Sequence, residues 1–201
     1  MAQTNLIDES RVSAAFFLSG FSALVYQVAW QRLLFGIVGV DIESVTIVVS
    51  TFMLGLGIGA PLGGALADIF HRRILIIFCI FEAVIAMFGL FSVDLINSTS
   101  TTFSSLARPA AALLSFTLLL LPTVCMGATL PMLVANRFKT LGNVGISTGQ
   151  LYFINTMGAA FGTVAVGFLL FYWLDVRETV TLAACINLLA SVIIATGLLK
   201  R

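Results

Sequence analysis

The fold is decided by residues 74–93, ILIIFCIFEAVIAMFGLFSV, an apolar run in which Glu82 is the one charged side chain. A helix of about 20 apolar residues is long enough to cross the hydrocarbon core of a bilayer. A charged side chain at that depth costs about 2.5–3.5 kcal/mol even on the insertion scales that give the lowest values. The run therefore predicts a membrane-spanning helix whose buried acid needs hydrogen-bonding partners.

Similar apolar segments fill most of the chain on both sides of this run. Hydrophobic residues make up 60% of the sequence and charged residues 9%, and the mean hydropathy is +1.11. This composition indicates an all-α polytopic membrane protein, a bundle of six transmembrane helices. We expect residues 1–11 to form a cytoplasmic head and residues 12–201 to form a single transmembrane domain. The predicted spans are residues 12–31, 44–67, 74–93, 110–135, 151–174 and 179–199.

The connections between the spans are predicted to be short and polar. Residues 97–105 are rich in serine and threonine, which is typical of a solvated loop. Residues 136–149 contain three glycines and two basic residues. We expect a flexible linker there.

The basic residues indicate how the bundle is oriented. Six spans place both termini on one side of the membrane, and seven of the ten basic residues fall on that side. These seven are Arg11, Arg72, Arg73, Arg137, Lys139, Lys200 and Arg201. The other three are Arg32, Arg108 and Arg177. Because basic loops stay in the cytoplasm, we expect both termini to be cytoplasmic, in a bacterial inner membrane.

Side chains that bind metals or carry out catalysis are sparse. The three cysteines lie on three different predicted spans without paired spacing, and His71 is the only histidine. This pattern favours packing roles for the cysteines and predicts no metal site and no cofactor. The basic residues are too few and too dispersed for a nucleic-acid interface. We therefore expect no catalytic residues in this chain.

Glycines mark two spans as close-packing helices. In the second span Gly55, Gly59 and Gly63 recur every four residues, and in the fifth span Gly158 and Gly162 have the same spacing. Small residues at this spacing let helix backbones approach each other in lipid, where apolar attraction between helices is weak. The glycine-rich helix is the second of the first three spans and again the second of the last three. The pattern thus suggests two three-helix repeats, an arrangement that transporters often use.

The polar residues in or beside the spans form the candidate site. Two interpretations of Glu82 stay open. Either it binds a proton or a cationic amine in a cavity between helices, or it is a structural acid that clasps Gln27, Asn155 or Asn187. Asn155 and the adjacent Thr156 are better explained by interhelical hydrogen bonds than by ligand binding. The candidates for substrate or proton binding are Glu82, Gln27, Tyr26, Arg32, Tyr152 and Asn155.

The loop between the second and third spans carries a cluster of charges. Asp68 lies at the end of the second span, and Arg72 and Arg73 precede the third. Asp68 can pair with either arginine and clasp the inner ends of the helices together. The alternative is that the two arginines only set the topology.

This loop resembles the signature loop of the major facilitator superfamily, Gly-x-Leu-Ala-Asp-x-x-Gly-Arg-Arg. The matching residues are Gly64, Leu66, Ala67, Asp68, Arg72 and Arg73. The chain departs from the motif at His71, where that family has a glycine that makes the turn. The resemblance implies a bundle like one half of a facilitator, with Gly64, Asp68, Arg72 and Arg73 as the clasp.

Three further stretches resemble the membrane part of spermidine-synthase-like fused proteins. They are residues 19–32 (SGFSALVYQVAWQR), 122–131 (PTVCMGATLP) and 152–160 (YFINTMGAA). In that family a helical module often precedes a soluble aminopropyltransferase-like domain. The resemblance therefore implies the membrane module without the enzyme. The family usually has a glutamate at the position of Gln27, so one intramembrane acid of the family is replaced here.

These observations are compatible with three functions. The first is a non-catalytic membrane module that works with partner chains, as a docking or scaffold subunit of a larger membrane complex or as a half-transporter. The small-residue faces of the second and fifth spans would then contact the partner. The second is a homodimeric transporter of a small solute such as a cationic amine, with Glu82 as the counter-charge. The third, implied by the resemblance alone, is a membrane anchor for a soluble spermidine-synthase-like enzyme. A half-facilitator supplies only half of a transport pathway, so we favour the first.

Overall fold

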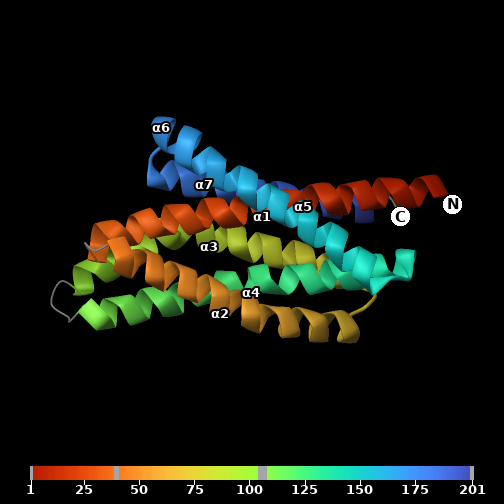
Figure 1. Ribbon diagram of the computed structural model, residues 1–201, viewed down its shortest axis with the longest axis horizontal. Coiled ribbons are helices and arrows are strands. Elements are labelled where there is room, and N and C mark those ends of the chain that lie inside the picture. The colour runs from red at the N-terminus through yellow and green to blue at the C-terminus, as the bar shows by residue number, and fades with distance from the viewer. Residues whose placement is uncertain (1, 39–40, 104–107, 200–201) are drawn as a thin grey trace.

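The structure is a computed structural model that describes residues 2–38, 41–103 and 108–199. Within these ranges all of the regular structure is helical, which confirms the predicted all-α class (Figure 1). The elements are α1 (Ala2–Val38), α2 (Asp41–Ile69), α3 (Ile74–Phe103), α4 (Arg108–Leu141), α5 (Val144–Ala165), the π-helix η1 (Val166–Leu170), α6 (Phe171–Trp173) and α7 (Val176–Leu198).

Six helical segments are long and apolar enough to cross a membrane, one of them formed by α5, η1 and α6 in succession. Each overlaps one predicted span, so the polytopic architecture is confirmed. Residues 2–11, expected as a cytoplasmic head, are helical and form the first part of α1. Figure 1 shows that α1 begins and α7 ends at the same end of the bundle, as an even number of spans requires. We call this the inner end, and the opposite end the outer end.

The prediction of a flexible linker over residues 136–149 is wrong, because only Gly142 and Asn143 separate α4 from α5. Gly142 has a φ of 65°, a left-handed conformation that glycine adopts at no steric cost and that ends α4. The side chain of Asn143 accepts a hydrogen bond from the amide of Ile146 at 3.0 Å and caps α5. A glycine that stops one helix and an asparagine that caps the next make a turn of two residues.

The prediction of a loop over residues 97–105 is wrong for the described residues 97–103, because α3 is helical as far as Phe103. Ser98 shows how a polar residue is accommodated there. Its hydroxyl donates to the backbone oxygen of Leu95 at 2.8 Å, which satisfies the side chain within the helix. Residues 104 and 105 lie outside the described residues.

The centre of the bundle consists of α1 and α4. Each buries half or more of its span, whereas the other four spans bury a third or less. Of the other helices, α2 packs most extensively against α4 and α5 against α1, while α7 lies against both α1 and α3 (Figure 1). The two most extensive contacts thus involve the two glycine-rich helices.

Glycines of α2 bring its backbone onto that of α4. A Cβ atom on Gly59 would overlap the carbonyl oxygen of Val124 and the amide nitrogen of Ala128. A Cβ atom on Gly63 would overlap the carbonyl oxygen of Ala128, and Gly55 meets α4 one turn earlier along the same row. Any larger residue in this row would separate the two helices.

The contact between α5 and α1 has the same geometry. Gly158 faces the carbonyl oxygen of Phe17 and the amide nitrogen of Phe21, and Gly162 faces the carbonyl oxygen of Phe21. In both contacts the first glycine meets a carbonyl and the amide four residues later. The second glycine then meets the carbonyl of that later residue.

A further pair of contacts follows the same correspondence. Gly20 of α1 faces the backbone oxygen of Asn155 on α5, and Gly127 of α4 faces that of Leu56 on α2. Figure 1 shows that α1 and α4 run in opposite directions. The segments α1–α3 and α4–α7 therefore pack as an inverted pair of three-helix repeats, in agreement with the glycine pattern of the sequence.

We expect Gly59→Ala to destabilise the bundle, because its Cβ would collide with the backbone of α4. Overpacking of this kind typically costs about 1–3 kcal/mol. Gly57→Ala is the matched control, since no atom lies within 4 Å of its Cβ position and alanine is the better helix former. Thermal unfolding in mild detergent should give a lower midpoint for Gly59→Ala only. Equal midpoints for the two variants would contradict the described packing of α2 on α4.

Candidate functional site

Glu82 is enclosed where α1, α3 and α7 meet, and none of its surface is exposed. Ser19 Oγ of α1 donates a hydrogen bond to Glu82 Oε1, and Asn187 Nδ2 of α7 donates one to Glu82 Oε2, each at 2.6 Å. Each carboxylate oxygen therefore has a donor from a different helix. These bonds offset the cost of burying the acid, and they tie the three helices together.

The helical spacing of α1 aligns its polar residues along one face. Ser19, Ser22 and Tyr26 are all buried and follow one another at intervals of three and four residues. Ser22 Oγ donates to the backbone oxygen of Ser19 at 3.0 Å, so it is satisfied within α1. We call Ser19, Ser22, Tyr26, Glu82 and Asn187 together the polar seam.

Tyr26 continues the polar seam toward the outer end. Its ring stacks on that of Trp30, with centroids 4.9 Å apart, and lies so close to Gly89 of α3 that a Cβ there would overlap it. Among the described residues, neither the Tyr26 hydroxyl nor Oδ1 of Asn187 has a hydrogen-bond partner. The Tyr26 hydroxyl oxygen, Asn187 Oδ1 and the Glu82 carboxylate are all acceptors, as the binding of a proton or an ammonium group requires. Since Glu82 and Tyr26 have no exposed surface, solvent does not reach them in this conformation.

Of the three clasping partners considered from the sequence, Asn187 bonds to Glu82. Among the described residues, neither Gln27 nor Asn155 forms a hydrogen bond with Glu82. Gln27 is half-buried and follows Tyr26 directly, so it lies on a different face of α1. Asn155 Nδ2 donates to the backbone oxygen of Phe16 at 3.0 Å and joins α5 to α1, which is the interhelical role expected of it.

Arg32 and Tyr152 lie apart from the polar seam. Arg32 is exposed, and its guanidinium lies over the ring of Phe171, 4.4 Å from the centroid, in a cation–π contact near the outer end. It therefore does not reach Glu82. Tyr152 is 61% exposed on α5. The structure thus brings together only Glu82 and Tyr26 of the six predicted site residues.

The signature-loop residues do not form the predicted clasp in this structure. Asp68, Arg72 and Arg73 are exposed, and neither of the ion pairs found among the described residues includes any of them. Another contact joins this loop to α4 instead. The ammonium group of Lys139 donates to the backbone oxygen of His71, the position at which the sequence departs from the facilitator motif.

The sequence analysis missed two polar interactions between helices. Ser19 was not among the proposed partners of Glu82, although it lies two helical turns before Tyr26 on the same face of α1. Asp94 and Arg177 form a bidentate ion pair that joins α3 to α7 near the outer end, with one N–H···O distance of 2.9 Å. Their signal was their location, since both lie just beyond predicted spans on the outer side.

We expect Glu82→Ala to lower the thermal midpoint of the detergent-solubilised protein, because it removes the acceptor of both Ser19 and Asn187. Each buried donor left unsatisfied costs about 1–3 kcal/mol. Glu82→Gln keeps the shape and one acceptor oxygen and should lose less. Glu43→Ala, which changes an exposed acid of α2, is the control and should leave the midpoint unchanged. Equal effects of Glu82→Ala and Glu43→Ala would show that the polar seam does not hold the helices together.

Comparison with known proteins gives one link. The chain is 28% identical over 171 residues to a polyamine aminopropyltransferase of Oceanobacillus iheyensis. The aligned region covers 85% of this chain but 32% of that protein, so the chain spans about a third of the relative's length. No family model and no solved structure matches the chain. The similarity supports a link between this helical membrane bundle and spermidine-synthase-like proteins.

Proposed function

We propose that this chain is a non-catalytic integral membrane module that works with partner chains, as a docking or scaffold subunit or as a half-transporter. The observation that carries the proposal is the enclosure of Glu82. Both of its oxygens accept hydrogen bonds from neighbouring helices, and no part of it is exposed. The acid that a cation pathway through this bundle would use is thus engaged in holding the bundle together.

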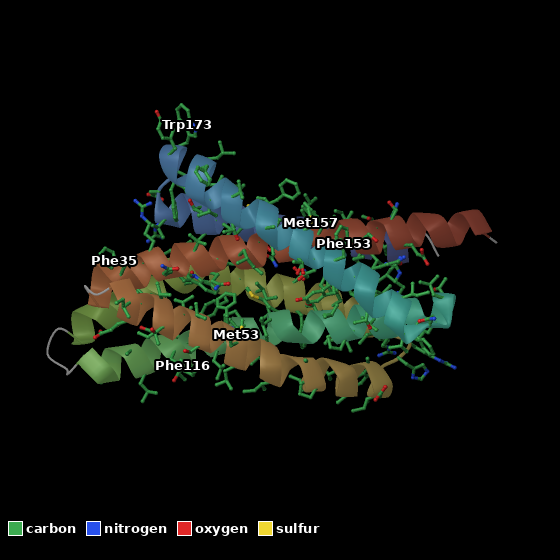
Figure 2. All side chains as sticks on the ribbon, viewed as in Figure 1. Phe35, Met53, Phe116, Phe153, Met157 and Trp173 are labelled. Atoms are coloured by element: carbon green, nitrogen blue, oxygen red, sulfur yellow. The ribbon has the colours of Figure 1, made fainter. Side chains whose placement is uncertain are left out.

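The surfaces available to a partner differ from those that the sequence suggested. The small-residue faces of α2 and α5 are buried against α4 and α1, so they do not remain free for another chain. The opposite faces carry exposed apolar side chains. Met53 of α2 and Phe153 of α5 are 61% and 63% exposed, and Met157 continues the α5 face (Figure 2). A partner within the membrane would compete with lipid for these faces.

The orientation belongs to the same proposal. Arg11, Arg137 and Lys139 all line one cavity at the end of the bundle where α1 begins and α7 ends. The positive-inside rule then puts this inner end in the cytoplasm, for which a bacterial inner membrane is the matching location. Lys200 and Arg201, which entered the same argument from sequence, lie outside the described residues.

A second function is favoured by the comparison. The relative is a polyamine aminopropyltransferase about three times as long as the aligned region, so the segment that matches this chain is only a part of it. By analogy, the bundle would anchor a spermidine-synthase-like enzyme to the membrane. In that case the partner is a soluble protein bound at the inner end, not a second membrane protein.

Purification from the membranes of the cells that encode the chain tests the proposal. The affinity-tagged protein would be extracted in mild detergent and weighed by native mass spectrometry. We expect a stoichiometric complex with a different chain, whose sequence tells a membrane partner from an aminopropyltransferase-like enzyme.

A transport assay supplies the opposing outcome. The purified chain alone would be reconstituted into liposomes and tested for uptake of radiolabelled spermidine, with Glu82→Gln and the exposed control Glu43→Gln beside it. We expect no uptake above empty liposomes. Uptake by the homodimer that Glu82→Gln abolishes and Glu43→Gln preserves would replace our proposal with a self-sufficient transporter of cationic amines.

A further inference from the structure

A cavity of about 170 Å³ opens at the inner end, among the ends of α1, α3, α4 and α7. It lies apart from the polar seam, and the proposed function assigns no ligand to it. One part of its wall is polar and charged, and the other part is apolar. The apolar wall consists of Val12, Leu75, Ile194 and Leu198.

The unusual group in the wall is the guanidinium of Arg137. Its side chain is only 11% exposed, and the one ion pair that it forms among the described residues, with Glu9, has a long N···O distance of 3.7 Å. Nε and Nη1 are buried and have no hydrogen-bond partner among the described residues. Buried N–H donors are normally paired, because leaving one unpaired forfeits its hydration without return. The unpaired N–H donors of Arg137 are therefore available to acceptors that bind in the cavity.

Two further cations line the same cavity. Arg11 lies across Gly197 of α7, where a Cβ atom would come within 3.2 Å of its Nη1, and it approaches Thr196 Oγ1 at 3.5 Å. Lys139 is the third cation, and Glu9 is the only acid in the described lining. Among the described lining residues, three cations against one carboxylate leave a surplus of positive charge. A multivalent anion would neutralise this surplus.

We propose that this cavity binds a phosphate group, held by the unpaired N–H donors of Arg137 with Arg11 and Lys139 beside it. Hydrogen bonds from a guanidinium to phosphate oxygens are charge-assisted and therefore stronger than neutral ones. A phosphate ion carries up to about two negative charges near neutral pH and the phosphodiester of a lipid carries one, so either lowers the surplus of positive charge. The phosphate is carried either by a lipid headgroup, whose chains would follow the apolar wall, or by a small soluble ion.

Thermal unfolding of the purified full chain tests the site and its source. The protein would be prepared in maltoside detergent without phosphate, and inorganic phosphate would be compared with chloride at equal ionic strength. Phosphatidylglycerol would be added in a parallel series, with native mass spectrometry to count bound lipid. We expect phosphate, phosphatidylglycerol or both to raise the midpoint, and Arg137→Gln to weaken the apparent affinity about tenfold or more, as expected for loss of charged hydrogen bonds.

The matched control is Arg73→Gln, which removes an exposed cation of the inner end that does not line the cavity. It should bind phosphate as the wild type does. If Arg137→Gln does not fold, Arg11→Gln removes a half-buried cation of the same wall and should weaken binding in the same direction. Stabilisation by phosphatidylglycerol alone identifies a lipid site, and stabilisation by inorganic phosphate identifies a site for a soluble anion. The proposal is overturned if neither probe stabilises the wild type, or if the Arg137 and Arg11 variants respond as Arg73→Gln does.

Discussion

Close backbone contact at glycine residues is the constraint on which this bundle depends. Lipid tails are as apolar as leucine side chains, so burial of apolar surface does not by itself hold helices together in a bilayer. Gly59 and Gly63 bring α2 onto α4, and Gly158 and Gly162 bring α5 onto α1. Because α1 and α4 are the central helices, both contacts converge on the middle of the molecule. The two contacts have the same geometry, so the two halves of the chain pack in the same way but in opposite orientations.

The polar seam adds a different kind of attachment to this frame. Helices α3 and α7 lack a glycine row of the kind that joins α2 to α4, and polar groups tie them to each other and to α1 instead. Glu82 bonds to Ser19 and Asn187 at mid-span, and Asp94 pairs with Arg177 near the outer end. A carboxylate that bonds to two other helices is expensive to leave unpaired in lipid. This is the physical reason to propose that Glu82 is a structural acid.

Described arginines at the two ends of the bundle differ in whether their side chains have partners. At the outer end Arg177 pairs with Asp94 and Arg32 lies on an aromatic ring, so both arginines have partners. At the inner end Arg137 is nearly enclosed, and two of its nitrogens have no partner among the described residues. Basic residues at an inner end are accounted for by topology alone when they point into water. Topology does not require that one of them be buried with unpaired donors beside a cavity.

The sequence by itself determined the all-α membrane class, the six spans, the glycine rows and the need of Glu82 for partners. These properties are local, since hydrophobic length, residue spacing and the charge of one side chain can be measured along a single helix. Tertiary structure alone decided that Ser19 and not Gln27 bonds to Glu82. It also decided that Lys139 joins α4 to the loop at His71, and that the glycine rows face inward. Those outcomes depend on the rotation and depth of each helix relative to its neighbours. Rotation and depth are set by all the contacts of the bundle together, and no single stretch of sequence contains them.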